Sequence, residues 1–180
     1  LSDRGEEKEK ALKKLHNLQK EDFLNIFKIL NGDEANIRLL DPPVHEFLPK
    51  TLEDKEKMAE ILSISLEAVE KRIYRLKDEN PMLGHRGCRL GVSYPELYRI
   101  QARAIIEAAY ECAKKGIKVH PEIMIPFIME AKELAYLRKE IEEEIESFFK
   151  EVGEKVEYKL GTMIEIPRAC LLANEIAEYA

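Results

Sequence analysis

Three charged side chains stand where the sequence predicts the ends of strands, two of them in apolar stretches and one in a glycine-rich segment. A charge inside a buried strand is costly unless it is paired or binds a ligand. Arg38 lies in "IRLLDPP", Arg86 in "GHRGCR" and Glu165 in "TMIEIP". The planar guanidinium group of arginine matches the oxygens of phosphate and carboxylate groups, so the two arginines indicate a site for an anionic ligand. A lone glutamate in this setting suits Mg²⁺, which takes few protein oxygens and leaves the rest to substrate and water. The alternative for each residue is a salt bridge that ties neighbouring strands together.

The segment around Arg86, "NPMLGHRGCRLG", combines charged side chains with three glycines. Gly84, Gly87 and Gly91 allow another group to approach closely, but the chain contains neither GxGxxG nor GxxxxGK[ST], so a tight turn is the simpler interpretation. We interpret His85 as a structural, hydrogen-bonded histidine and expect Arg89 to pair with a neighbouring carboxylate.

The remaining histidines and the cysteines do not indicate a metal centre. The odd number of cysteines and the absence of CxxC spacing argue against disulfides and against a zinc site, and the histidines are not spaced as ligands either. We therefore expect reduced thiols and do not interpret Cys88 as a nucleophile. The residues concerned are Cys88, Cys112, Cys170, His16, His45 and His120.

The order of the expected elements predicts an α/β protein. Helical periodicity covers residues 6–30, about 95–115, 130–153 and the segment from 168 onward. Apolar runs that predict strands end near Leu40, cover 121–129 as a strand buried on both faces, and cover 155–167; the glycine-rich segment is expected to contain or follow a short strand. Strands separated by helices are typical of βαβ units in a parallel sheet, whose functional groups lie at the carboxyl ends of the strands. An open sheet and a closed barrel both remain possible.

Residues 51–79 form a separate helical unit within the domain, which we take as 1–180. Thr51 and Ser65 are expected to cap two helices. The pair resembles a DNA-binding helix-turn-helix, but six Lys and Arg against eight Asp and Glu give it no basic face. We therefore favour a small helical insertion and keep a helix-turn-helix DNA-binding protein as an alternative from a different functional class.

The bulk composition excludes several classes of protein. A formal net charge of −6 argues against a protein built to bind nucleic acid. No apolar run approaches the roughly 18 residues of a membrane span, and the N-terminal sequence is not a signal peptide. We expect a cytoplasmic protein that binds neither nucleic acid nor a membrane.

Three motifs, "IRLLDPPVHEFLP", "NPMLGHRGCRLGVSYPELYRIQARAI" and "GTMIEIPRA", together resemble the pyruvate phosphate dikinases in their C-terminal phosphoenolpyruvate/pyruvate-binding domain. The resemblance runs over essentially the whole chain. Phosphoenolpyruvate synthase and enzyme I of the sugar phosphotransferase system share parts of these motifs, but "GHRGCRLG" and "LLDPPVHEF" favour the dikinases.

The resemblance implies a (β/α)₈ TIM barrel, of which the chain would hold roughly the first half without the opening strand. It implies a phosphotransferase that interconverts ATP, phosphate and pyruvate with AMP, pyrophosphate and phosphoenolpyruvate, using a phosphohistidine on a separate domain of the same parent chain. By resemblance, Arg38 and Arg86 clamp the phosphoryl group and the carboxylate, and Glu165 is a Mg²⁺ ligand.

Several functional residues of the family lie outside the part of the barrel that this sequence resembles. The family's barrel continues beyond the "AEYA" motif with an asparagine, the aspartate that is a second Mg²⁺ ligand, and a proton-handling cysteine, and none of the three cysteines here lies in that motif. We therefore expect the fragment alone to be inactive. A half-barrel leaves strand edges uncovered, so we also expect it to self-associate as a homo-oligomer.

Overall fold

The computed structural model describes residues 5–76 and 84–180. The chain divides into two compact units. Residues 42–76 and 84–86 belong to the smaller unit, and residues 5–41 and 87–180 belong to the larger one.

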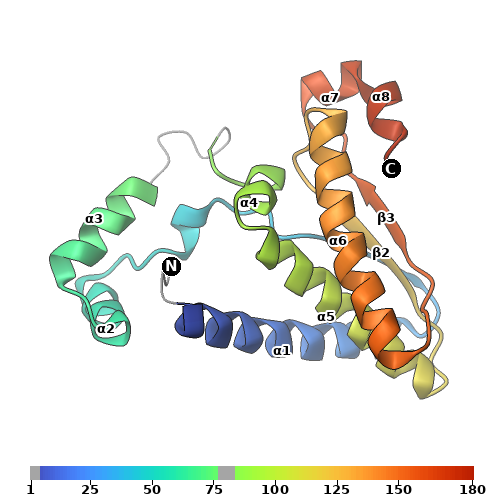
Figure 1. Cartoon of the computed structure of the whole chain (residues 1–180), viewed down its shortest axis with the longest axis horizontal. Coiled ribbons are helices and arrows are strands. Elements are labelled where there is room, and N and C mark those ends of the chain that lie inside the picture. Colours follow the sequence, from blue (N-terminus) through green and yellow to red (C-terminus); the bar gives the residue numbers. More distant parts are fainter. Residues whose placement is uncertain (1–4, 77–83) are drawn as a thin grey trace. The chain divides into compact units, whose positions relative to one another are not determined.

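A three-stranded parallel sheet organises the larger unit (Figure 1). The strands β1 (Glu34–Arg38), β2 (His120–Ile125) and β3 (Lys159–Thr162) lie in that order, with β2 in the middle. In the register, Ile37 lies beside Ile123, which lies beside Leu160. The three carboxyl ends therefore meet at one edge of the sheet, as the predicted α/β order requires.

The two faces of the sheet have different environments because side chains alternate along a strand. Ile123 and Leu160 are buried on the face that packs into the core with the helices. On the opposite face, Arg38 is exposed while its register neighbours Met124 and Gly161 are half-buried. The strand predicted within 121–129 is confirmed, but its extent and its burial on both faces are wrong: the strand ends at Ile125 and has one well-covered face.

Three long helices build the core around this sheet. They are α1 (Gly5–Leu30), α5 (Pro95–Lys114) and α6 (Ala131–Val152), and they confirm the helices predicted at 6–30, 95–115 and 130–153. Helix α5 contacts α1, α6 and β2. It carries alanines and isoleucines on its buried side, which lets the neighbouring helices approach closely.

Ion pairs join α5 to its two neighbouring helices. Arg103 of α5 contacts Glu144 at 3.0 Å and also pairs with Glu151, both on α6. On the other side, Lys20 of α1 lies 2.9 Å from Glu107 of α5. Burial raises the pKa of Glu107, but hydrogen bonds from Lys20 and Arg103 outweigh it, so the pKa lies below its usual range. The carboxylate therefore stays charged at neutral pH and holds the helices together.

Shorter helices complete the larger unit. Helix α4 (Cys88–Ser93) precedes α5, and α7 (Pro167–Leu171) and α8 (Ala173–Ala177) follow β3. The expected strand in the glycine-rich segment is not found in its described part, because residues 84–87 are irregular and α4 follows directly. The part of that prediction that falls on residues 80–83 lies outside the described residues.

The smaller unit contains the 3-10 helix η1 (Val44–Phe47) and the helices α2 (Leu52–Leu62) and α3 (Leu66–Leu76). The predicted caps are confirmed: the hydroxyl oxygen of Thr51 accepts the N–H of Asp54 at 3.1 Å, and that of Ser65 accepts the N–H of Ala68 at 3.2 Å. Residues 77–79, the end of the predicted insertion, lie outside the described residues.

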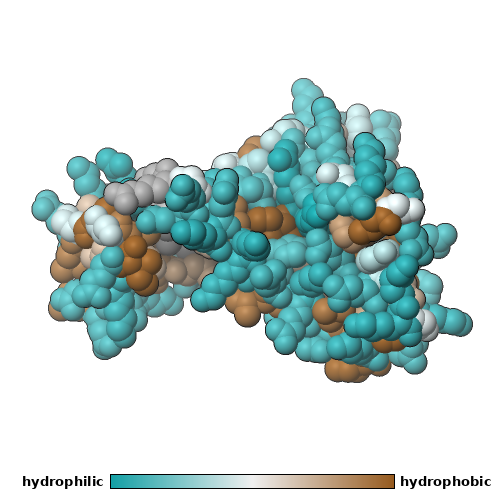
Figure 2. Space-filling view, turned by 60° about the horizontal axis from the view of Figure 1, so that its bottom comes forward, coloured by the Kyte–Doolittle hydropathy of each residue, from teal (hydrophilic) through white to brown (hydrophobic). Residues whose placement is uncertain are grey.

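The surface is mainly polar on the face shown in Figure 2, where hydrophobic residues form separate patches. Exposed apolar side chains in the larger unit include Ile29 and Leu171, each 83% exposed. Among the helices described by the structure, none has the length and apolar character needed to cross a membrane.

Candidate functional site

Arg38 is the last residue of β1 and projects from the less covered face of the sheet. Its Nη1 lies 3.7 Å from Oδ2 of Asp41, whose side chain is buried, whereas the side chain of Arg38 is 51% exposed. The arginine is thus held at its charged end by a buried carboxylate and still reaches solvent. Sequence reasoning did not single out Asp41, although its position three residues after Arg38 in "IRLLDPP" is a usable signal.

Helix α5 fixes the chain between Arg38 and Asp41. The side-chain oxygen of Gln101 accepts the N–H of Leu40 at 2.8 Å, and the hydroxyl of Tyr98 donates to the carbonyl of Leu40 at 2.9 Å. Burial raises the pKa of Tyr98 well above its usual range, so the phenol remains a donor. These two bonds satisfy both backbone groups of Leu40 and thereby hold the turn that carries Asp41.

The turn after β2 is centred on Phe127, which has a left-handed φ of 68°. Non-glycine residues rarely adopt this conformation, and it persists where the surrounding structure holds it. Three contacts surround the turn: Cys88 donates its N–H to the carbonyl of Pro126 at 3.0 Å and its thiol to the carbonyl of Phe127 at 3.0 Å, and Gly87 packs against the Phe127 side chain.

Glu165 lies three residues beyond β3, which ends at Thr162 rather than continuing through residue 167 as predicted. Its side chain points back to the neighbouring strand end: Oε1 accepts the N–H of Phe127 at 2.8 Å. The hydroxyl of Thr162 and the N–H of Met163 both donate to the carbonyl of Ile125, at 2.8 and 3.1 Å. The connection after β3 is therefore tied to the end of β2 before the glutamate, at Thr162 and Met163, and again by the glutamate side chain.

Cys88 is a structural donor rather than a nucleophile, in agreement with the interpretation of the sequence. The thiol is fully buried, and burial, with a smaller contribution from Glu133, raises the pKa of Cys88 to about 12. The thiol is therefore protonated at neutral pH, and its proton is directed at the carbonyl of Phe127.

Arg89 contacts an aromatic ring and a sulfur. Its guanidinium carbon lies 5.3 Å from the centre of the Phe127 ring, and its Nη2 lies 3.6 Å from the sulfur of Met129. These are cation–π and sulfur contacts, and they attach the start of α4 to the turn after β2. Neither contact tests the expected pairing of Arg89 with a carboxylate, which stays a prediction.

Arg86 belongs to the smaller unit, where its N–H donates to the carbonyl of Gly84 at 3.1 Å and its side chain is half-buried. The next residue, Gly87, belongs to the larger unit and donates its N–H to the carbonyl of Asp41 at 3.2 Å. The structure thus brings Arg38 and Glu165 to the carboxyl ends of β1 and β3, whereas Arg86 is described within the smaller unit.

Among the described residues, no group of three or more His, Cys, Asp or Glu side chains is arranged to hold a metal ion. At the carboxyl edge of the sheet, Glu165 offers one carboxylate, and its Oε2 has no hydrogen-bond partner within the described part of the chain. A single hard oxygen donor is compatible with Mg²⁺ if substrate and water supply most of the other ligands.

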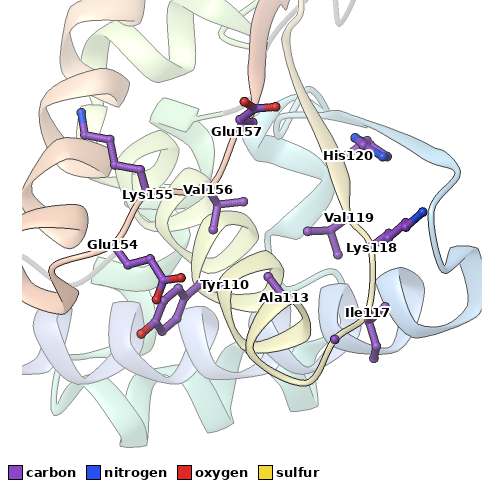
Figure 3. A pocket seen from close by; sticks show the side chains of 11 residues that line it. Tyr110, Ala113, Ile117, Lys118, Val119, His120, Glu154, Lys155, Val156 and Glu157 are labelled. Carbon is purple, nitrogen blue, oxygen red and sulfur yellow. The ribbon is translucent and has the colours of Figure 1, made fainter.

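A hollow of about 580 Å³ lies at the opposite, amino end of the sheet (Figure 3). Its lining mixes Lys118 and Lys155 with Glu154 and Glu157, and Glu154 is already paired with Lys114 at 3.4 Å. Because this mixture offers no excess charge of either sign, and because parallel α/β folds place ligands at the carboxyl edge, we do not take this hollow as the functional site.

Comparison with known proteins shows which family the chain belongs to. A sequence model of the "PEP-utilising enzyme, PEP-binding domain" family matches residues 3–180. The chain belongs to this family. The match includes the helices α2 and α3.

This PEP-binding-domain chain is similar to curated pyruvate, phosphate dikinases. It is 46% identical over 180 residues to that of Giardia intestinalis and 46% identical over 181 residues to that of Clostridium symbiosum, in both cases covering 100% of the chain. It is 47% identical over 180 residues to the chloroplastic protein of Mesembryanthemum crystallinum, covering 98% of the chain. The resemblance seen in the three sequence motifs is confirmed. The chain spans about a fifth of the length of these relatives (20%, 21% and 19%).

Proposed function

We propose that the chain is the part of a pyruvate, phosphate dikinase that binds pyruvate and phosphoenolpyruvate. The observation that carries this proposal is the match to dikinases over the full chain at 46% identity. The whole enzyme would convert ATP, phosphate and pyruvate into AMP, pyrophosphate and phosphoenolpyruvate, and the reverse, through a phosphohistidine on another domain of the same chain.

The proposed fold of this part is a segment of a (β/α)₈ barrel. The three parallel strands, with helices on one face and Arg38, Met124 and Gly161 on the less covered face, support it. In such a barrel the less covered face would line the interior, and the carboxyl edge would carry the active site. Completing the barrel would bury the face that is now the more open one.

The proposed roles follow from chemistry at the carboxyl edge. Arg38, oriented by Asp41, would bind the phosphoryl group or the carboxylate of the substrate through its planar fork. Arg86 would bind the other anionic group, an assignment that rests on the family resemblance. Both guanidinium groups would hold the substrate in line for transfer and offset its negative charge, which is the protein's main contribution to phosphoryl transfer.

Glu165 would hold Mg²⁺ through one carboxylate oxygen. The donor set fits, because the carboxylate is exposed and one of its oxygens is oriented by the Phe127 N–H. When bound, the ion would stabilise negative charge that develops on the enolate form of pyruvate. The work of this chain's own residues is to orient Glu165 and to place the two arginines.

The decisive experiment measures the products of the full-length enzyme that carries this segment. With ATP, pyruvate and inorganic phosphate as substrates, we expect pyrophosphate to form in a one-to-one ratio with phosphoenolpyruvate and to depend on added phosphate. Release of phosphate from ATP without formation of pyrophosphate would indicate phosphoenolpyruvate synthase chemistry instead. Failure to form phosphoenolpyruvate, with or without added phosphate, would exclude both activities.

A further inference from the structure

A single backbone hydrogen bond controls the orientation of the proposed metal ligand. We propose that Phe127 is a positioning residue: its N–H fixes Oε1 of Glu165, so that Oε2 is the oxygen presented to the cation. This inference rests on the proposed function of Glu165 and adds a residue that has no ligand role of its own.

The glutamate needs such a partner because of where it lies. Glu165 lies after the end of β3 and is exposed, so neither strand pairing of its backbone nor burial of its side chain fixes the position of the carboxylate. A glutamate side chain has several rotatable bonds, and ordering it costs up to roughly 2 kcal/mol of conformational entropy. The Phe127 N–H at 2.8 Å from Oε1 orders the carboxylate before any ligand binds.

The donor is available because the chain leaves the sheet at this residue. β2 ends at Ile125, and the left-handed φ of 68° at Phe127 turns the chain away from the strand direction. The N–H therefore takes no part in the pairing of the strands and donates to Glu165 in the connection after β3. A conformation this uncommon for phenylalanine has to be maintained by its surroundings.

Helix α4 supplies these surroundings through its first residues. Cys88 binds the two carbonyl groups that flank the Phe127 N–H along the backbone, those of Pro126 and of Phe127 itself, each at 3.0 Å. Arg89 lies over the Phe127 ring at 5.3 Å. The peptide that donates to Glu165 is thus held by its neighbours on both sides and by its side chain.

Gly87 completes this arrangement by its lack of a side chain. A Cβ atom at this position would lie 2.4 Å from the Cβ of Phe127, which is closer than any real contact. The segment Gly87–Arg89 therefore acts on Glu165 through Phe127, and this is the role we assign to the part of "GHRGCR" that follows Arg86.

The test replaces the Phe127 amide by an ester in the full-length enzyme, by incorporating the α-hydroxy analogue of phenylalanine. This change removes the N–H and keeps the side chain. Binding of Mn²⁺, with pyruvate present and nucleotide absent, is followed by electron paramagnetic resonance. We expect the Kd for Mn²⁺ to rise roughly tenfold or more, the usual effect of losing a partner that orients a metal ligand.

An ester at Tyr136, in the second turn of α6, is the matched control, because it also removes one backbone N–H but lies on a helix outside the turn. We expect its Kd for Mn²⁺ to stay within about twofold of that of the unmodified enzyme. Equal effects at both positions, or no effect at Phe127, would overturn the proposal.

A second set of variants covers the case in which the ester enzyme does not fold. Cys88→Ala removes the donor to the Phe127 carbonyl, Cys88→Ser retains one, and Cys112→Ala alters another buried cysteine, on α5. We expect a raised Kd for Mn²⁺ and a raised KM for Mg²⁺ in Cys88→Ala, with recovery in Cys88→Ser and no change in Cys112→Ala. The same Kd in all three variants would contradict the proposal.

Glu165→Gln separates this proposal from the function on which it rests. If Glu165→Gln leaves Mn²⁺ binding unchanged, Glu165 is not a metal ligand and its proposed function fails. If Glu165→Gln weakens binding and the Phe127 ester does not, the metal role of Glu165 stands and the positioning role of Phe127 is wrong.

Discussion

The buried carboxylate of Asp41 lies 3.7 Å from the guanidinium group of the half-exposed Arg38 at the end of β1. A buried charge facing an exposed partner orients that partner, because the carboxylate is itself fixed by the bonds of Tyr98 and Gln101 to Leu40. The exposed end of the guanidinium group then remains available for a ligand.

Substituting Asp41→Asn is therefore expected to weaken substrate binding in the full-length enzyme. The change keeps the side-chain volume and removes the charge, which we expect to cost about 1 kcal/mol, or roughly fivefold in kcat/KM for phosphoenolpyruvate. Steady-state kinetics measure the effect. Asp33→Asn, in the exposed turn before β1, is the control and should leave kcat/KM unchanged. A similar effect of both substitutions would contradict the orienting role of Asp41.

Arg86→Lys tests the second proposed anion contact. Lysine keeps the positive charge but lacks the planar fork, so the full-length enzyme should lose most of its pyruvate turnover, by roughly tenfold or more. Arg75→Lys, on the exposed side of α3, is the matched control and should behave as the unmodified enzyme. Near-normal turnover of Arg86→Lys would show that Arg86 is not part of the site.

Much of the fold was predictable because its signals are local. Thr51 and Ser65 precede helices with the appropriate side chains for capping, and the apolar spacing in α1, α5 and α6 gives their bounds to within a residue or two. The carboxyl ends of the strands were predicted as the place for Arg38 and Glu165 from the α/β order alone.

The contacts that orient the site were not predictable in the same way. The end of β3 at Thr162 depends on where pairing with β2 stops, and a continuous apolar run does not show this point. The left-handed conformation of Phe127 has no signal in the residue type, since phenylalanine normally avoids it. Its cause is tertiary: Cys88 and Gly87 come from a segment about 40 residues away in the sequence.

Gly87→Ala should destabilise the chain strongly. The residue has a φ of 53°, and an added Cβ would lie 2.4 Å from that of Phe127, so backbone strain and overpacking together should cost about 2–4 kcal/mol. Urea unfolding followed by circular dichroism measures this cost. Gly153→Ala is the control: its φ is 72°, but the added Cβ meets no atom within 4 Å.

Both glycines have positive φ values, but ψ is −133° at Gly87 and 11° at Gly153, so the control measures the strain of the left-handed helical conformation without a clash. Gly153→Ala should lose about 1 kcal/mol, the usual cost of alanine at a helix C-terminus in this conformation. Equal losses for the two variants would show that Phe127 can move away from an added methyl group. The packing at Gly87 would then not hold Phe127 in place.

The three thiols should differ in reactivity. Cys170 is exposed, whereas Cys88 and Cys112 are buried, and burial raises the pKa of both buried thiols, that of Cys88 to about 12. At pH 8, a disulfide reagent that releases a coloured thiolate should therefore modify one thiol quickly in the folded chain and all three in denaturant.

The pH dependence follows from the sign of the shift. Below its raised pKa, a buried thiol stays protonated, so raising the pH to 9 should leave the reaction of Cys88 slow. Cys170→Ser should abolish the fast phase. A fast phase that persists in this variant would show that Cys88 or Cys112 is accessible, and the Cys88 thiol would then not be a fixed donor to Phe127.

The 180-residue chain by itself should self-associate. The strands β1 and β3 are the outer strands of the sheet, and one face of the sheet carries exposed or half-buried side chains, including Met124. Unpaired strand edges next to an open face favour pairing with another copy. Sedimentation velocity over a range of concentrations should show a sedimentation coefficient that rises with concentration. Single, concentration-independent monomers would contradict this expectation, because they would show that the open face is stable in water without a covering partner.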